Sequence, residues 1–430
     1  MKITSSYGIE IKQMNKIFRS AVAIYNNAIS FCIDVFENEW LNIKKLDTVM
    51  RKQYAESIIH TTKNNKAKYN FDNKFYKMPS YMRRSVINQA LGYLSSYHSN
   101  LHNWYANGSV GNKPAFQRRL NKFPAFYKDN MYLSNADDTV QLKLYIDNDW
   151  KWVTVKLKHT DMQYIRKHLQ DTKMSVPTLE KKHHKWFLRF AFEENVELKN
   201  TEDKILAIDL GINTDATCSV MGKDGTILAR KFINFASDKD QINHTLNKIK
   251  GVSQKYGSHN TTKLWRVAKF RNEELARKIA KAISDYAKEW DVDVIVFEHL
   301  DTKGKKRGSR KQKLHMWKKN SIQKYVGHKA HRQGIRISRI CAWNTSKLAY
   351  DGSGNVARDS SNYSLATFNN GKKYNCDLSA SYNIGARYLI RELEKSIPVK
   401  DWSLIQAKVP ECVKRTQCTY STFVEILKVA

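Results

Sequence analysis

Three acidic residues stand where a folded chain could bring their carboxylates together. Asp209 directly follows the apolar run 205–208, Glu298 follows the largely apolar run 292–297, and Asp377 begins a segment with helical spacing. Functional groups collect at the carboxyl ends of strands in α/β sheets, and a carboxylate at the edge of a core needs a partner. Hard divalent cations are the natural partner of clustered carboxylates. The three acids together therefore predict a metal site, although any one of them alone is better explained as a solvated strand-end residue.

A site of this kind suits the hydrolysis of a phosphodiester. Two Mg²⁺ ions held about 3.5–4 Å apart can activate a water molecule and stabilise the leaving 3′-oxygen. We therefore expect two Mg²⁺ ions as the cofactor, held by Asp209, Glu298 and Asp377.

The elements that would position these acids form an α/β block beginning at Ile205. We expect a buried strand over 205–208, strands at 216–221 and 226–230 joined by a turn at 222–225, and another buried strand over 292–297. A long helix would begin at Asn272, whose side chain can act as its N-cap. A further helix begins at Asp377 and turns Leu378, Tyr382 and Leu389 inward.

The first 200 residues form two other blocks. Apolar residues recur at steps of three and four over 18–36 and over 86–105, which predicts two helices that each bury one face. From Gly111 the spacing changes to strand-like alternation over 140–146 and 153–157, and a hairpin is expected within 176–192. We interpret residues 111–200 as a small β-barrel or sandwich.

The charge balance indicates a polyanionic partner. The 430 residues include 74 Lys and Arg against 41 Asp and Glu, a formal net charge of +33. Nucleic acid is the usual partner of a basic chain that is also rich in aromatic residues. An anionic membrane surface is the rival interpretation, but no segment concentrates the charge on an amphipathic helix. The candidate nucleic-acid-binding residues are Arg83, Arg84, Lys113, Arg118, Arg119, Lys122, Lys305, Lys306, Arg307 and Arg310.

The sequence favours the cytoplasm over a membrane. No run approaches the roughly 18 apolar residues of a membrane span. The six cysteines are scattered and none forms a Cys-x-x-Cys pair, which suits a reducing compartment. We expect no membrane partner and a cytoplasmic location in a prokaryotic cell, associated with the nucleoid.

Three segments resemble the RuvC motifs of the TnpB proteins and the type V CRISPR nucleases. They are residues 207–213 (Ala-Ile-Asp-Leu-Gly-Ile-Asn), 293–300 (Asp-Val-Ile-Val-Phe-Glu-His-Leu) and 375–384 (Asn-Cys-Asp-Leu-Ser-Ala-Ser-Tyr-Asn-Ile). The resemblance holds in order and spacing over residues 205–392. It implies an α/β RNase H-like RuvC domain in which Asp209, Glu298 and Asp377 are the metal-binding catalytic acids.

The same resemblance implies a multidomain α+β protein with a helical recognition lobe, a β-barrel wedge domain and a RuvC domain that carries a small insertion. The expected boundaries are 1–15 for the first wedge strand, 16–110 for the recognition domain, 111–200 for the wedge domain, 201–340 for the first part of the RuvC domain, 341–374 for the insertion, 375–395 for the last RuvC motif and helix, and 396–430 for a tail of unassigned role. The implied partners are a structured guide RNA and double-stranded target DNA, read beside a short motif. The number of subunits for each guide stays open.

The insertion departs from the family pattern. Residues 343–346 (Trp-Asn-Thr-Ser) resemble the segment that leads into a zinc ribbon. The positions expected for ligand cysteines carry Ala349, Gly352 and Asn370. Cys341 and Cys376 cannot close a four-ligand site, so we expect no structural zinc.

Two basic features stand near the expected site. Arg358 corresponds to a basic residue that contacts the scissile strand in relatives, and we include it among the catalytic candidates. The loop 303–313 follows Glu298 closely and suits a lid or a phosphate contact, or else it is a solvated surface loop.

Three alternatives to an RNA-guided DNA endonuclease stay open. An RNA-guided repressor that binds DNA without cutting it would be expected to have lost an acid. An actin-like ATPase or sugar kinase would explain residues 209–214 as a phosphate loop, but a second Asp-x-Gly loop is missing and the charge of +33 does not fit. A guide-free RuvC-type resolvase would not explain the function of the first 200 residues.

Overall fold

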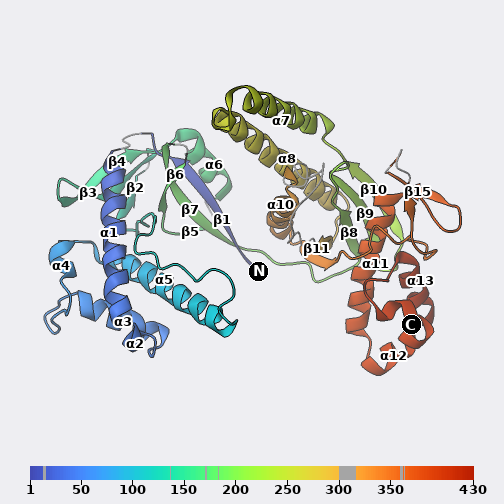
Figure 1. The fold of residues 1–430 in the computed structure, drawn as a ribbon, viewed down its shortest axis with the longest axis horizontal. Coiled ribbons are helices and arrows are strands. Elements are labelled where there is room, and N and C mark those ends of the chain that lie inside the picture. The colour runs from blue at the N-terminus through green and yellow to red at the C-terminus, as the bar shows by residue number, and fades with distance from the viewer. Residues whose placement is uncertain are drawn as a thin grey trace. The chain divides into compact units, whose positions relative to one another are not determined.

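The computed structural model describes residues 1–12, 16–135, 137–169, 172–182, 184–299, 316–358, 362 and 364–430. The chain divides into two compact units, Lys2–Glu194 and Asn195–Ala430, the second of which also includes Met1. Figure 1 shows helices and strands in both units, as expected for a multidomain α+β protein. Within the described ranges, no helix is long and apolar enough to cross a membrane. The division into seven finer segments stays a prediction.

The helices of the N-terminal unit form where the sequence predicts buried faces. They are α1 (Ile17–Asn38), α2 (Trp40–Ile43), α3 (Thr48–Ile59), α4 (Phe71–Lys74) and α5 (Ser80–Ala106). The helix α1 buries Tyr25, Ile29 and Ile33 on one face, and the Tyr25 hydroxyl lies 2.8 Å from Ser85 Oγ on α5. The two long helices therefore pack against each other, as the three- and four-residue spacing predicts.

The strands of this unit form two open sheets. One sheet has the order β2 (Tyr132–Ser134), β3 (Thr139–Ile146) and β4 (Asp149–Lys156), with both pairs antiparallel. In the other, β7 (Lys185–Asn195) lies between β1 (Lys2–Glu10) and β5 (Lys173–Met174), and β6 (Thr178–Lys182) also pairs with β7. The helix α6 (His159–Leu169) follows β4.

The predicted closed β-barrel is therefore wrong. A barrel requires continuous hydrogen bonding between the edge strands. Among the described residues of this unit, isolated bridges stand where ladders would have to run, such as Ile11 to Leu157 beyond the ends of β1 and β4. The hairpin expected within 176–192 is confirmed, because β6 and β7 pair antiparallel.

The C-terminal unit is built on a five-stranded sheet. Its order is β10 (Ile227–Ile233), β9 (Ala216–Gly222), β8 (Lys204–Asp209), β11 (Val294–His299) and β12 (Arg336–Cys341). The strands β8, β11 and β12 run parallel, whereas β9 runs antiparallel to both β8 and β10. The four strands predicted in this block are confirmed, and the sheet has the strand order 3-2-1-4-5 when its strands are numbered along the chain.

Helices cover both faces of this sheet (Figure 1). On one face, Leu206 and Ile208 of β8 share a core with α8 (Thr262–Glu289) and α10 (Lys319–Arg332), beside α7 (Ala236–Tyr256). On the other face, Ile205 and Ala207 share a core with α11 (Cys376–Ser396). Because both of its faces are buried, β8 has a continuous run of apolar residues rather than alternating apolar and polar residues.

Asn272 does not cap a helix, which corrects that prediction. The helix α8 begins ten residues earlier, at Thr262, and Asn272 lies in its interior. The Asn272 side chain is buried and donates from Nδ2 to the Met316 carbonyl at 2.6 Å. A long-range partner thus satisfies the amide that would otherwise compete with the helix backbone.

The segment after β12 forms a small sheet and three short helices. The sheet has the order β13 (Ala357–Arg358), β14 (Leu365–Thr367) and β15 (Lys373–Asn375). Past α11, the chain forms α12 (Val399–Lys408), the 3₁₀ helix η2 (Pro410–Val413) and α13 (Tyr420–Val429). Trp402, Phe423 and Ile426 from these elements join the core beneath α11, so residues 396–430 are part of the fold of this unit.

Candidate functional site

The register of the central strands sets two of the predicted acids side by side. Ile208 pairs with Phe297 in the parallel ladder between β8 and β11. The next residue on each strand is an acid, Asp209 on β8 and Glu298 on β11. Both side chains therefore stand at the carboxyl edge of the sheet, where parallel α/β proteins place functional groups.

The third acid reaches the same edge from a helix. Asp377 lies in the first turn of α11, where Asn375 is the N-cap and its Oδ1 accepts from the N–H groups of Asp377 and Leu378, both at 3.0 Å. A carboxylate in the first turn is favoured by the helix dipole. A side chain at Gly385 would collide with Met221 of β9, so this glycine lets α11 lie close against the sheet.

The three carboxylates lie close enough for their charges to interact. Burial raises the pKa of Asp209 well above its usual range, and the charges of Glu298 and Asp377 raise this pKa further. The Arg358 guanidinium acts in the opposite direction. Burial also raises the pKa of Glu298, against a hydrogen bond from Thr345 and the charge of Arg387. Neighbouring acids that resist ionisation together form a site that favours a cation.

The acids suit a divalent cation by their chemistry rather than by a preformed coordination shell. Carboxylate oxygens are the ligands that Mg²⁺ prefers, and a cation would relieve the repulsion among them. In the part of the chain that the structure describes, however, no three His, Cys, Asp or Glu side chains converge in the arrangement that holds a metal ion. The binding of a cation would therefore have to draw the three carboxylates together.

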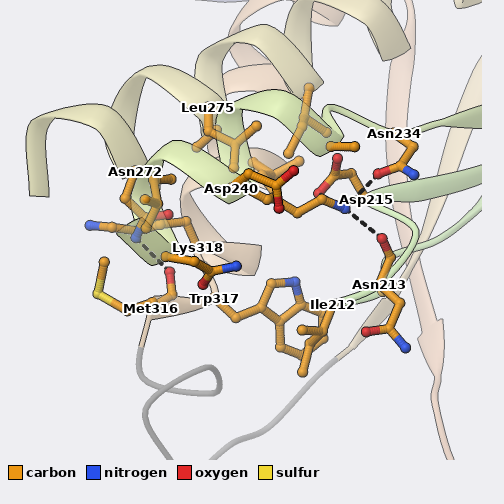
Figure 2. Close-up of a pocket in the computed structure, with 18 of the residues that line it drawn as sticks. Ile212, Asn213, Asp215, Asn234, Asp240, Asn272, Leu275, Met316, Trp317 and Lys318 are labelled. Atoms are coloured by element: carbon orange, nitrogen blue, oxygen red, sulfur yellow. Dashed lines mark hydrogen bonds and ion pairs between the residues drawn. The ribbon is translucent and has the colours of Figure 1, made fainter. Parts of the chain in front are cut away.

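A separate cavity lies beside this edge of the sheet (Figure 2). It has a volume of about 320 Å³ and is bordered by the segment just after Asp209, by α7 and α8, and by the residues that precede α10. Its labelled polar side chains include Asn213, Asp215 and Asp240, and Trp317 closes one side. None of the three acids lines this cavity, so we treat it as distinct from the acid site.

Comparisons with known proteins agree with this fold. The sequence model of the Aq_aa04 family matches residues 5–146. A TnpB-like protein of Methanocaldococcus jannaschii is 24% identical over 174 residues, which are 36% of this chain and 59% of that protein. A TnpB-like protein of Aquifex aeolicus is 24% identical over 233 residues, which are 47% of this chain and 74% of that protein. The chain thus spans a little over half the length of the first relative.

A solved structure shows the same fold over most of the chain. The mini-RNA-guided endonuclease CRISPR-Cas_phi3 matches with a TM-score of 0.51 and 10% identity, over 89% of this chain and 92% of that one. Curated TnpB-like relatives and a type V fold thus point to one assignment. These similarities support an assignment of the chain to the TnpB and type V effector family.

The insertion at residues 341–374 places Arg358 beside the acids. Arg358 lies on β13, where its guanidinium donates to the Ser346 carbonyl at 2.9 Å and its charge acts on Asp209. The side chain is exposed. It therefore stands beside the site and can reach an anion, although its role in catalysis stays a prediction.

The residues predicted to bind nucleic acid differ in the exposure and ion pairing of their side chains. Arg83 is buried, and its guanidinium donates to Glu56 at 3.1 Å, so its charge is committed to an internal ion pair. The other described candidates are exposed, with ion pairs from Arg84 to Glu56 and from Arg118 to Asp34. Lys305, Lys306, Arg307 and Arg310 lie outside the described residues.

Three polar residues near the acids were missed by sequence reasoning. Thr345 donates a hydrogen bond to the Glu298 carboxylate. Asn383 and Arg387 are buried on α11, where their side chains bond to main-chain atoms of surrounding segments. The one signal available was polarity in an otherwise apolar helical stretch, because Asn383 and Arg387 stand four residues apart, on the same face.

Proposed function

We propose that this chain is an RNA-guided DNA endonuclease. It would cut DNA by Mg²⁺-dependent hydrolysis at a single RuvC site, after a guide RNA pairs with target DNA beside a short motif. The observation that supports this proposal is that Glu298 and Asp377 lie close enough to raise the pKa of buried Asp209, at the carboxyl edge of the central sheet. The similarity to TnpB-like proteins and the charge of +33 fit nucleic-acid partners. A prokaryotic cytoplasm is the location that we propose.

The residues of the site have distinct tasks in this proposal. Asp209, Glu298 and Asp377 would hold the cations, and the ionisation of Asp209 and Glu298 is the step that burial opposes. Bound Mg²⁺ would supply a Lewis acid and a more acidic water molecule. Arg358 would contact a phosphate of the strand that enters the site, because its guanidinium is exposed beside Asp209.

The substitution Asp209→Ala tests the assignment of the site. We expect cleavage to fall to background, whereas binding of RNA and DNA stays unchanged because those contacts lie elsewhere. Cleavage is measured on labelled duplex DNA with Mg²⁺, and binding by filter retention or gel shift. Asp285→Ala is the matched control, since Asp285 is exposed on α8, where it pairs with Lys281. Undiminished cutting by the Asp209 variant would contradict the assignment.

The guide is tested by expressing the protein with its native flanking DNA and sequencing the RNA that copurifies. One discrete RNA with a structured scaffold and a variable end would support RNA guidance, and a repeat-derived scaffold would indicate a CRISPR origin rather than a transposon. Random RNA that salt removes would instead favour a guide-free nuclease. A guide-bound protein that binds target DNA without cutting it would favour the repressor.

A further inference from the structure

Glu298 is held at both its main chain and its side chain. The Glu298 carbonyl accepts from Gln323 Nε2 at 3.0 Å, and Gln323 is fixed in turn by Arg339 at 3.0 Å. The Glu298 carboxylate accepts from the hydroxyl of Thr345. Glu298 is 7% exposed and Thr345 is 2% exposed, so water does not compete for this bond. The orientation of the carboxylate is therefore set by Thr345.

The Thr345 hydroxyl has a choice of two acceptors. Besides the carboxylate, the Ala342 carbonyl lies 3.0 Å away. A hydroxyl donates one hydrogen bond at a time, and a charged acceptor forms the stronger bond. A carboxylate that binds a cation is ionised. The hydroxyl therefore donates to Glu298 in the form of the site that would bind metal.

The loop that carries Thr345 is fixed by Asn383 of α11. Asn383 Nδ2 donates to the carbonyls of Thr345 at 3.0 Å and Leu348 at 2.9 Å. Its Oδ1 accepts from the main-chain N–H of Tyr420 at 3.0 Å. Asn383 is fully buried, and both ends of its amide are bonded. A buried polar group satisfied in this way permits one arrangement of its neighbours.

A second side chain of α11 ties the same segments together. Arg387 donates to the carbonyls of Cys341 at 2.9 Å and Trp343 at 2.7 Å, just before the Thr345 loop. It also donates to the carbonyls of Thr416 and Cys418, both at 3.0 Å, just before Tyr420. The last part of the chain is thus bonded to the helix that carries Asp377 and, through it, to the loop that holds Glu298.

We propose that Thr345 and Asn383 are positioning residues for Glu298, and that the main-chain N–H of Tyr420 fixes them in place. We call this series of hydrogen bonds, from Tyr420 through Asn383 and Thr345 to Glu298, the Glu298 relay. This inference rests on the proposed function, because it assigns Glu298 to a cation site. It gives the C-terminal residues a role in catalysis without contact with substrate.

The first test compares Thr345→Val with Thr345→Ser in the full chain. Valine keeps the shape of threonine without the hydroxyl, whereas serine keeps the hydroxyl. The affinity for Mn²⁺ is measured by the loss of the free-ion electron paramagnetic resonance signal, with Asp209→Ala defining binding at the site. We expect affinity and cleavage rate to fall about 10- to 100-fold in Thr345→Val, as for other residues that orient metal ligands, and to recover in Thr345→Ser.

The matched control is Thr245→Val on α7. Thr245 is also buried, at 5% exposure, and its hydroxyl donates to the Gln241 carbonyl at 2.8 Å and accepts from Arg271 at 3.0 Å. We expect this variant to match the wild type in Mn²⁺ affinity and cleavage. Equal losses in Thr345→Val and Thr345→Ser, or no loss in Thr345→Val, would overturn the proposal.

The second test removes one N–H group at the far end of the relay. Tyr420 is the first residue of α13 after the N-cap Thr419, whose backbone is extended. Proline is tolerated at such a position. Tyr420→Pro and Tyr420→Ala both lose the ring, but only proline lacks the N–H that Asn383 accepts. We expect the Mn²⁺ affinity of Tyr420→Pro to be several-fold lower than that of Tyr420→Ala. The two variants should have equal unfolding temperatures.

The two proposals fail in different ways. A wild-type chain that binds Mn²⁺ through Asp209 but cuts no DNA contradicts the nuclease function, and the relay is still decided by the Mn²⁺ affinities of the variants. A chain that cuts DNA with equal Mn²⁺ affinity in Tyr420→Pro and Tyr420→Ala refutes the role of the Tyr420 N–H in the relay.

Discussion

At the scale of single residues, Asp209 and Glu298 are carboxylates held where their charge is disfavoured. Burial raises the pKa of both, and the pKa of Asp209 rises further because two other acids stand nearby. Groups whose ionisation is opposed by their surroundings are typical of functional sites, where stability is sacrificed for chemistry. Ionisation of these two carboxylates should therefore lower the free energy of unfolding.

Asp209→Asn should stabilise the metal-free protein while it abolishes cleavage. The pKa of Asp209 is raised, so its ionised form destabilises the folded state at neutral pH, and a neutral amide removes this penalty. We therefore expect a higher free energy of unfolding in Asp209→Asn than in the wild type. The measurement is thermal or urea unfolding in EDTA at pH 7.

The pH dependence of this gain provides its control. The penalty is fully present above the raised folded pKa of Asp209 and disappears below the ordinary carboxyl pKa of about 4. The difference between Asp209→Asn and the wild type should therefore shrink as the pH falls. A variant that is less stable than the wild type at neutral pH would contradict the raised pKa.

At the scale of elements, aromatic rings hold the degenerate insertion together. The ring of Tyr350 lies 5.0–5.8 Å from those of Tyr374, Tyr382 and Phe368, and 6.1 Å from that of Tyr420. Around it, Asn370 Nδ2 donates to Asp351 at 3.0 Å, and Lys372 Nζ donates to the Tyr350 hydroxyl at 2.7 Å. Residues at two of the predicted ligand positions thus have other contacts: Ala349 joins the small core and Asn370 bonds to Asp351.

We predict that Tyr350, rather than zinc, stabilises this insertion. Tyr350→Ala should lower the free energy of unfolding of the C-terminal unit by about 2–4 kcal/mol, because it leaves a cavity among the rings. Tyr350→Phe, which loses only the bond from Lys372, should cost less than about 1 kcal/mol. Urea unfolding checks both variants. A zinc chelator should leave the unfolding of the wild type unchanged, and stoichiometric zinc in the purified protein would contradict the prediction.

A buried carboxylate, Glu39, bonds to several segments of the N-terminal unit. Glu39 is 5% exposed and accepts from Lys68, Tyr69, Tyr54 and Asn42, and the bonds from Lys68 and Tyr69 do most to lower its pKa to about 2. It therefore links the segment between α1 and α2 to the segment before α4.

Glu39→Gln should destabilise this unit in a pH-dependent way. At pH 7 we expect a loss of about 1–3 kcal/mol, the range for hydrogen bonds to charged groups. A lowered pKa stabilises the fold above the unfolded pKa of about 4.3, and this stabilisation disappears as the pH falls towards about 2. Unfolding at pH 7 and pH 3 measures the change, and the exposed Asp34→Asn is the control.

At the scale of the whole molecule, the charge of +33 sets how the protein responds to salt. Each phosphate contact that is lost should reduce the slope of log affinity against log salt by about 1. We predict this reduction for RNA binding by Arg119→Ala and by Lys122→Ala, whose side chains are exposed. Titrations between low and high salt provide the measurement.

Arg83→Ala is the matched control for the salt prediction. Arg83 is buried and paired with Glu56, so its loss should lower the unfolding temperature and leave the salt slope unchanged. A reduced slope in Arg83→Ala with normal stability would show that this arginine contacts nucleic acid after all.

The sequence alone determined the positions of the central strands and of the three acids. The run 205–208 is apolar, and the run 292–297 largely so, because both faces of the sheet are covered, and the acid directly after each run lies at the sheet edge. Asp377 follows from the same kind of local signal, since Asn375 caps the helix that carries it. Local patterns suffice where a side chain is positioned by its own strand or helix.

Only the tertiary structure decided the contacts between distant segments. The open sheets, the burial of Arg83 and the interior place of Asn272 depend on partners far along the chain. Thr345 lies 47 residues from Glu298, and Tyr420 lies 37 residues from Asn383. Hydrogen bonds of this kind leave no periodicity in the sequence, because they depend on which elements meet in space rather than on the spacing within one element.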